Sequence, residues 1–177
     1  MSFVGGVGYS NIDLIYSGLE RLPEKGEEIF ARGFSMQFGG GIPATMINLS
    51  RLGVESRILT FAGDDLFSEF VKKTLEKYPV KTVNLYRGDK MPVVLSSTLL
   101  YGGDRSFISY TDGMDLNDAV MDEVYENLKG VSVVDMHVGF LDVYKRLKKD
   151  GCIQIFDTGW EDDLTLEKYR DYLETAD

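Results

Sequence analysis

Residues 38–53, FGGGIPATMINLSRLG, place three consecutive glycines before a proline and a ten-residue helical pattern. Glycine costs conformational entropy on folding, so three in a row indicate a positive φ or a close approach to the backbone. Pro43 suits a first helical turn, and Gly53 suits the left-handed residue that ends a helix. We therefore expect a buried helix whose N-terminal amides face a ligand; a tight turn without a ligand is the alternative.

Short apolar runs alternate with helical patterns on both sides of this stretch. The runs are FVGGVGY, RILTFAGDD, VSVVDM and CIQIFD, and helical patterns cover residues 66–78, 141–150 and 164–173. Strands that alternate with helices pair in parallel through right-handed crossovers. The sequence therefore predicts an α/β fold: a Rossmann-like, doubly wound, mainly parallel sheet flanked by helices.

Two segments depart from this alternation and have the pattern of antiparallel strands. One is GEEIFARGFSMQF, and the other is VVLSSTLLY followed by RSFISY, with Gly102, Gly103 and Asp104 between them. Glycine and aspartate in so short a connection are typical of a hairpin. We expect residues near 14–37 and 93–110 to form a separate small sheet, a lid over the main one; an extension of the main sheet's edge is the alternative.

Composition excludes several functional classes. The chain has 29 acidic and 19 basic residues, a net charge of −10, which argues against a nucleic-acid partner. Cys152 and His137 are the only residues of their kinds, so an internal disulfide and a Cys/His zinc cluster are excluded and no metal site is expected. The first residues do not resemble a signal peptide, and no stretch is long enough to span a membrane. We expect a cytoplasmic protein without a membrane partner.

Two phosphate-binding motifs fail on inspection. No glycine is followed by lysine, so the chain has no Walker-type loop. Gly6 and Gly8 begin a G-x-G, but Asn11 stands where the third glycine of a dinucleotide fingerprint belongs. A nicotinamide oxidoreductase therefore stays only as an alternative.

An ordered set of landmarks resembles the ribokinase-like (PfkB-type) carbohydrate kinase family over essentially the whole chain. These are VGYSNID, LPEKGEE, GGGIPATMINLSRLG, FAGDDLF, LLYGGDRSFISY and IFDTGW, in that order. The resemblance implies a sugar bound between a Rossmann-like domain and a β lid. It also implies ATP and Mg²⁺ as cofactors and transfer of the γ-phosphoryl group to a hydroxyl of a small carbohydrate.

The resemblance assigns the sugar site residue by residue. Asp13 accepts hydrogen bonds from two sugar hydroxyls, with Asn11 beside it, and Gly39 and Gly40 donate backbone N–H groups. Candidates for lid cover over the sugar are Met36, Phe38, Phe107 and Tyr110, and candidates for the pocket rim are His137, Asp157 and Trp160. The alternatives are an exposed turn residue for Asp13, ordinary packing for the lid residues and a satisfied core or rim histidine for His137.

Other positions are expected to serve structure or to depart from the family. Gly63, Asp64 and Asp65 resemble a G-x-D element that caps the next helix. Ala44 stands where many relatives have a sugar-binding asparagine, which leaves the sugar open. The stretch DTGW lacks the asparagine and arginine that some sugar-acid and fructose kinases carry, which weakens a 2-keto-3-deoxygluconate kinase hypothesis.

The family's N-x-x-E and G-A-G-D motifs are absent from the 177 residues. We therefore expect residues 1–177 to be the N-terminal portion of a ribokinase-like domain, with the general base and the nucleotide site beyond Asp177. By itself this portion is expected to be inactive and to contain no catalytic residue. The alternatives are a sugar-binding or regulatory module and a nucleoside kinase of the same family. A homodimer through the lid is also expected, because a small sheet exposes edges and an apolar face.

Overall fold

A five-stranded parallel sheet forms the centre of the molecule in the computed structural model, which describes residues 2–159 and 161–177. The strand order is β5-β4-β1-β8-β9, and every neighbouring pair is parallel. The strands are β1 (Val4–Val7), β4 (Ser56–Thr60), β5 (Lys81–Asn84), β8 (Val133–Met136) and β9 (Ile153–Phe156).

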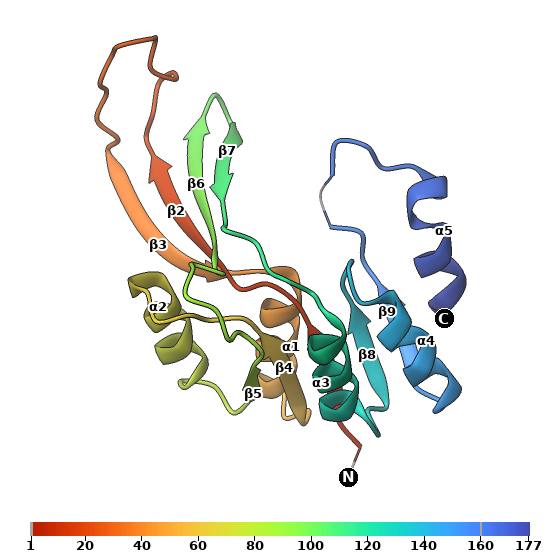
Figure 1. Ribbon diagram of the computed structural model, residues 1–177. Helices are drawn as coiled ribbons and strands as arrows, with labels where there is room; N and C mark the ends of the chain where they lie inside the picture. Colours follow the sequence, from red (N-terminus) through yellow and green to blue (C-terminus); the bar gives the residue numbers. More distant parts are fainter. Residues whose placement is uncertain (1, 160) are drawn as a thin grey trace.

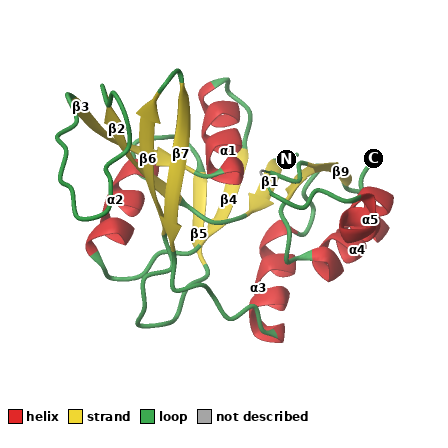
Figure 2. Ribbon diagram, turned by 90° about the horizontal axis from the view of Figure 1, so that it is seen from above, coloured by secondary structure: helices red, strands yellow, loops and turns green. Residues whose placement is uncertain are grey.

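Helices cover both faces of this sheet, as Figure 2 shows for α1 and α3. One apolar cluster joins the sheet to α1 (Gly41–Arg51) and α2 (Leu66–Leu75). A second cluster on the other face joins it to α3 (Asp118–Leu128), α4 (Leu141–Lys149) and α5 (Leu166–Thr175). The predicted doubly wound α/β fold is confirmed.

The glycines of β1 let helices pack directly on the central strand. A Cβ on Gly6 would lie 2.6 Å from Ile42 of α1, and one on Gly8 would lie 2.8 Å from the same side chain. A Cβ on Gly5 would lie 2.7 Å from Leu128 of α3 on the opposite face. The G-x-G of the sequence therefore serves helix packing, and it brings the N-terminus of α1 beside the end of β1.

A second, four-stranded sheet projects from the carboxyl end of the first, upward in Figure 1. Its order is β3-β2-β6-β7, with β2 (Asn11–Ser17), β3 (Gly33–Gly39), β6 (Val94–Tyr101) and β7 (Asp104–Tyr110). Gly102 and Gly103, with φ of 59° and 83°, close the β6–β7 hairpin, as their sequence predicts. We call this sheet the lid.

The lid differs from its predicted bounds at two places. It begins at Asn11, because the chain leaves the main sheet after Val7, so Asp13 lies within a lid strand and not at the end of a main-sheet strand. The strand β3 begins only at Gly33. Residues 26–32 form no strand. Before β3 the chain makes a turn, in which the Glu27 side chain accepts a hydrogen bond from the backbone N–H of Glu24.

Strand register gives the lid two chemically different faces. Asp13 lies opposite Ser96, and Ser96 opposite Ser109, so these side chains share one face. This polar face includes Asn11, Asp13, Gln37, Ser96, Thr98, Phe107 and Ser109, with Ile15 and Leu100 farther toward the lid tip. The other, apolar face includes Ile12, Leu14, Phe34, Met36, Phe38, Leu95, Ser97, Ile108 and Tyr110, and its inner end joins the α1–α2 cluster.

Candidate functional site

Asp13 offers a carboxylate with one bonded and one open oxygen. The Asn11 amide donates to Asp13 Oδ1 at 2.8 Å. Among the described residues, no hydrogen bond reaches Oδ2. Burial raises the pKa of Asp13, the Asn11 N–H lowers it, and the net direction is upward. The open oxygen is suited to accept hydrogen bonds from ligand hydroxyls.

Two of the three glycines shape the backbone around this carboxylate. A Cβ on Gly39 would lie 2.9 Å from Asp13 Oδ2, so any side chain there would occupy the space beside the open oxygen. Gly40 has a φ of +101°, and a Cβ on it would lie 2.5 Å from the carbonyl oxygen of Tyr9. Gly39 therefore keeps the site open, whereas Gly40 makes the turn into α1.

The N-terminus of α1 meets the site without a side-chain cap. Gly40 is its N-cap residue and supplies no side-chain hydrogen bond, whereas Asp65, Asn117 and Thr165 cap α2, α3 and α5. The first amides of an uncapped helix are available to oxygen atoms of a ligand. The predicted donation of backbone N–H groups by Gly39 and Gly40 to a sugar stays a prediction.

His137 reaches the same region through Tyr9. The two rings meet edge to face with centroids 5.4 Å apart. The backbone carbonyl oxygen of Tyr9 lies 2.5 Å from the position that a Cβ on Gly40 would occupy. His137 Nδ1 lies 2.8 Å from the carbonyl oxygen of Val138. Because a carbonyl only accepts, Nδ1 donates, and the neutral ring carries its acceptor at Nε2.

An acidic residue near His137 escaped the sequence analysis. Asp135 on β8 is half-buried, and burial is the largest influence on its pKa, which it raises. The Thr45 hydroxyl and His137 lower this pKa and the Asp157 carboxylate raises it, and the net direction is upward. Asp135 therefore lies near His137 and Asp157, and all three residues are close to the carboxyl ends of β8 and β9. The sequence signal that could have indicated Asp135 is its charge inside the apolar run VVDMHV.

Asp157 is exposed, and its side chain accepts a hydrogen bond from the backbone N–H of Gly159 at 2.9 Å. This contact organises the turn after β9, and a pocket role for Asp157 stays a prediction. Trp160 lies outside the described residues.

The proposed lid residues divide between the two faces. Phe107 lies on the polar face with Asp13 and is 54% exposed. Met36, Phe38 and Tyr110 lie on the apolar face, because alternate residues of a strand point to opposite sides. The Tyr110 hydroxyl donates to Asp112 at 2.8 Å. The structure therefore brings Phe107 to the side of Asp13 and does not bring the other three there.

Two serines of the polar face were not singled out from the sequence. Ser96 Oγ lies 3.3 Å from Asn11 Oδ1 and 2.9 Å from Ser109 Oγ. No sequence signal marks them, because serines in a strand are common and only the register shows which face they share.

The capping prediction for the G-x-D element is confirmed at Asp65. Its side chain accepts from the backbone N–H groups of Phe67 and Ser68. Burial raises the pKa of Asp65, but the Ser68 hydroxyl and these N–H groups outweigh it and lower the pKa. Asp64 is fully exposed and pairs with Lys72 at 3.3 Å.

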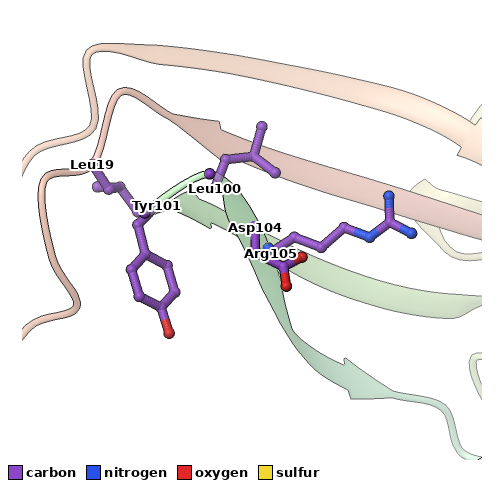
Figure 3. Close-up of a pocket in the computed structure, with 7 residues that line it drawn as sticks. Leu19, Leu100, Tyr101, Asp104 and Arg105 are labelled. Atoms are coloured by element: carbon purple, nitrogen blue, oxygen red, sulfur yellow. Dashed lines mark hydrogen bonds between the residues drawn. The ribbon is translucent and has the colours of Figure 1, made fainter.

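Two hollows of the described surface are not lined by Asp13. One of about 490 Å³ at the lid tip is lined by Leu19, Tyr101 and Arg105 (Figure 3). Another of about 720 Å³ lies between residues 85–90, 112–117 and α3. Within residues 2–159 and 161–177, no group of three or more His, Cys, Asp or Glu is placed to hold a metal ion. In the same ranges no helix is long and apolar enough to cross a membrane.

A parallel sheet with helices on both faces, a four-stranded lid and a carboxylate at the lid's base is the architecture of ribokinase-like proteins. The chain belongs to the pfkB family of carbohydrate kinases, whose profile matches residues 1–177. It is 31% identical over 127 residues to a curated protein of Pyrococcus horikoshii named "Putative sugar kinase PH1459"; the match covers 70% of this chain and 39% of that one.

Solved structures share the fold. Ribokinase of Arabidopsis thaliana, solved in complex with ribose and ATP, matches with a TM-score of 0.70 at 22% identity, covering 92% of this chain and 55% of that one. Ribokinase of Giardia lamblia matches with a TM-score of 0.79 at 16% identity, covering 99% and 56%. The chain thus spans about half the length of these relatives or less.

Proposed function

We propose that this chain carries the sugar-binding half of an ATP-dependent sugar kinase, which transfers the γ-phosphoryl group to a hydroxyl of a small carbohydrate. The observation that carries the proposal is the open Oδ2 of Asp13 beside Gly39. Family membership supports the reaction class, and the Arabidopsis ribokinase, solved with ribose and ATP, supports the two substrates.

In this proposal Asp13 accepts hydrogen bonds from two sugar hydroxyls, and Asn11 holds its other oxygen. Backbone N–H groups at Gly39 and Gly40 donate to the sugar's oxygens. Phe107 covers the sugar from the lid, and His137 contributes an acceptor at the rim. A hydrogen bond to a charged group contributes about 1.5–3 kcal/mol, so Asp13 supplies the largest single share of sugar affinity.

ATP and Mg²⁺ are expected to bind mostly outside these residues. Among the described residues no group of three or more His, Cys, Asp or Glu is placed to hold a metal ion, and no step through magnesium is assigned to them. We place the nucleotide site and the general base beyond Asp177. The half-length coverage of the relatives supports that placement.

We further propose that a second copy covers the apolar face of the lid. Leu14, Met36, Ser97 and Ile108 form one row across all four strands of this face. Met36 is 40% and Ile108 69% exposed in the single chain. An exposed sheet face of this kind is stabilised when another surface buries it.

The test uses the full-length protein, ATP and Mg²⁺ with D-ribose, D-fructose, D-glucose and adenosine in turn. Sugar-dependent ADP release supports the kinase, and adenosine-dependent release instead supports a nucleoside kinase. Sugar binding by calorimetry without ADP release would favour the sugar-binding module. Neither binding nor ADP release with any of the four would contradict the proposal.

A further inference from the structure

Four side chains on three lid strands form a continuous chain of hydrogen bonds. Ser109 on β7 meets Ser96 on β6 at 2.9 Å, Ser96 meets Asn11 on β2 at 3.3 Å, and Asn11 meets Asp13 at 2.8 Å. All four lie on the polar face of the lid. The chain therefore runs across the lid and ends at the carboxylate of the proposed sugar site.

The chemistry of the groups fixes the direction of every bond. An ionised carboxylate only accepts, so Asn11 must turn its NH₂ group toward Asp13. The Asn11 oxygen then faces Ser96, whose single hydroxyl hydrogen must be donated to it. Ser109 must in turn donate to Ser96. Every hydrogen points toward Asp13, which assigns the Asn11 amide orientation from the network itself.

We propose that Ser96 and Ser109 are positioning residues of the sugar site. They hold the Asn11 amide in one orientation, which keeps Asp13 Oδ1 bonded and leaves Oδ2 turned to a substrate hydroxyl. The role in catalysis rests on the proposed function, whereas the orientation of Asn11 and Asp13 does not.

Burial explains why these serines matter. Ser96 is only 6% exposed, so water does not readily replace it as a donor to the Asn11 oxygen. Without that donor the half-buried Asn11 amide oxygen loses its hydrogen bond from Ser96, and the amide gains other rotamers. Bonds in such a chain also polarise one another, so loss of one weakens the next.

The kinetic test uses full-length protein and whichever of D-ribose, D-fructose and D-glucose gives the highest kcat/KM. Ser96→Ala should raise the sugar KM about three- to tenfold, the loss of one ordinary hydrogen bond, and change kcat less than about twofold. Ser109→Ala should act in the same direction more weakly, and Ser96→Thr should restore the KM. Ser97→Ala is the matched control, since Ser97 lies on the apolar face.

A double-mutant cycle separates positioning from direct contact. If Ser96 acts through Asn11, then adding Ser96→Ala to Asn11→Ala should leave the sugar KM unchanged. The same factor in both backgrounds would overturn the proposal, because Ser96 would then act independently of Asn11.

A third measurement needs no sugar and no turnover. The Asp13 carboxyl is followed by ¹³C NMR across an acid titration. Ser96→Ala should move the Asp13 pKa upward, because burial and the Asn11 N–H are the two influences on it and the second is weakened. Ser97→Ala should leave it in place. An unmoved Asp13 pKa in Ser96→Ala overturns the proposal, whereas a wild type without turnover on any sugar counts only against the kinase.

Discussion

Asp13 Oδ2 lies 2.9 Å from the point that a Cβ on Gly39 would occupy, so the glycine and the open carboxylate oxygen depend on each other. Gly39 on β3 pairs with Asn11 on β2, so it lies diagonally across the two strands from Asp13, near the point where the lid meets α1. A residue with a side chain at position 39 would fill the space that we propose a sugar hydroxyl occupies. Two of the three glycines thus meet separate demands, space at Gly39 and backbone conformation at Gly40, whereas Gly41 has neither a positive φ nor an atom within 4 Å of the position of a Cβ.

Substitutions at these two glycines should therefore fail in different ways. Gly39→Ala has no positive φ to oppose it, and its contact is with the far end of a flexible side chain. We expect normal folding and a sugar KM raised about tenfold or more. Gly40→Ala forces an alanine into a positive-φ conformation that non-glycine residues rarely adopt, at a cost of about 1–3 kcal/mol, and adds a clash with the Tyr9 carbonyl. Thermal unfolding and KM measured together separate the two, and an unstable Gly39→Ala would argue against the assignment.

Sugar binding should weaken on acidification at a higher pH than an ordinary aspartate would produce. The pKa of Asp13 is raised, and a protonated carboxyl loses an acceptor for the sugar. Affinity should be full above the raised pKa and lost as the pH falls through it. Calorimetry of sugar binding without ATP measures this midpoint. A midpoint at or below the usual aspartate value near 4 would contradict the expectation.

Asp135→Asn should raise the stability of the protein at neutral pH. Burial raises the pKa of Asp135 in the folded state, so its contribution to stability is present below the unfolded pKa and is lost as the pH rises through the folded pKa. At pH 7 the wild type therefore carries the cost of a half-buried charge. We expect Tm to rise at pH 7 and the gain to disappear near pH 4. The exposed Asp163→Asn serves as the control, and an equal gain there would refute the reasoning.

A charge on the apolar face of the lid should disrupt the proposed dimer. Ile108→Asp places a carboxylate in the row that a second copy would cover, whereas Arg105→Asp on β7 points to the polar side. Sedimentation at micromolar concentration should give a dimer for the wild type and Arg105→Asp, and a monomer for Ile108→Asp. A monomeric wild type, with or without sugar, rules this interface out.

The sequence predicted the layers of the fold better than the faces of the lid. Alternating strands and helices indicated the parallel sheet, and Gly102 and Gly103 indicated the hairpin. The opposite orientation of Phe107 and Tyr110 follows from their spacing within one strand. Which of them shares a face with Asp13 depends on strand register, which is set by pairing partners far apart in the chain. Ser96 and Ser109 escaped notice for the same reason. Asp65 could be placed at a helix start from its neighbours, because capping is a local interaction.

Phosphoryl transfer by the full-length protein is the most direct test of the account. ADP release is measured with ATP, Mg²⁺ and the preferred sugar for the wild type, Asp13→Ala and Asp65→Ala. Asp13→Ala should fold normally and lose about a hundredfold or more in kcat/KM, since it gives up charged hydrogen bonds to substrate. Asp65→Ala should keep its kcat/KM and lose about 0.5–2 kcal/mol of stability. A folded Asp13→Ala with wild-type kinetics would contradict the placement of the sugar at Asp13.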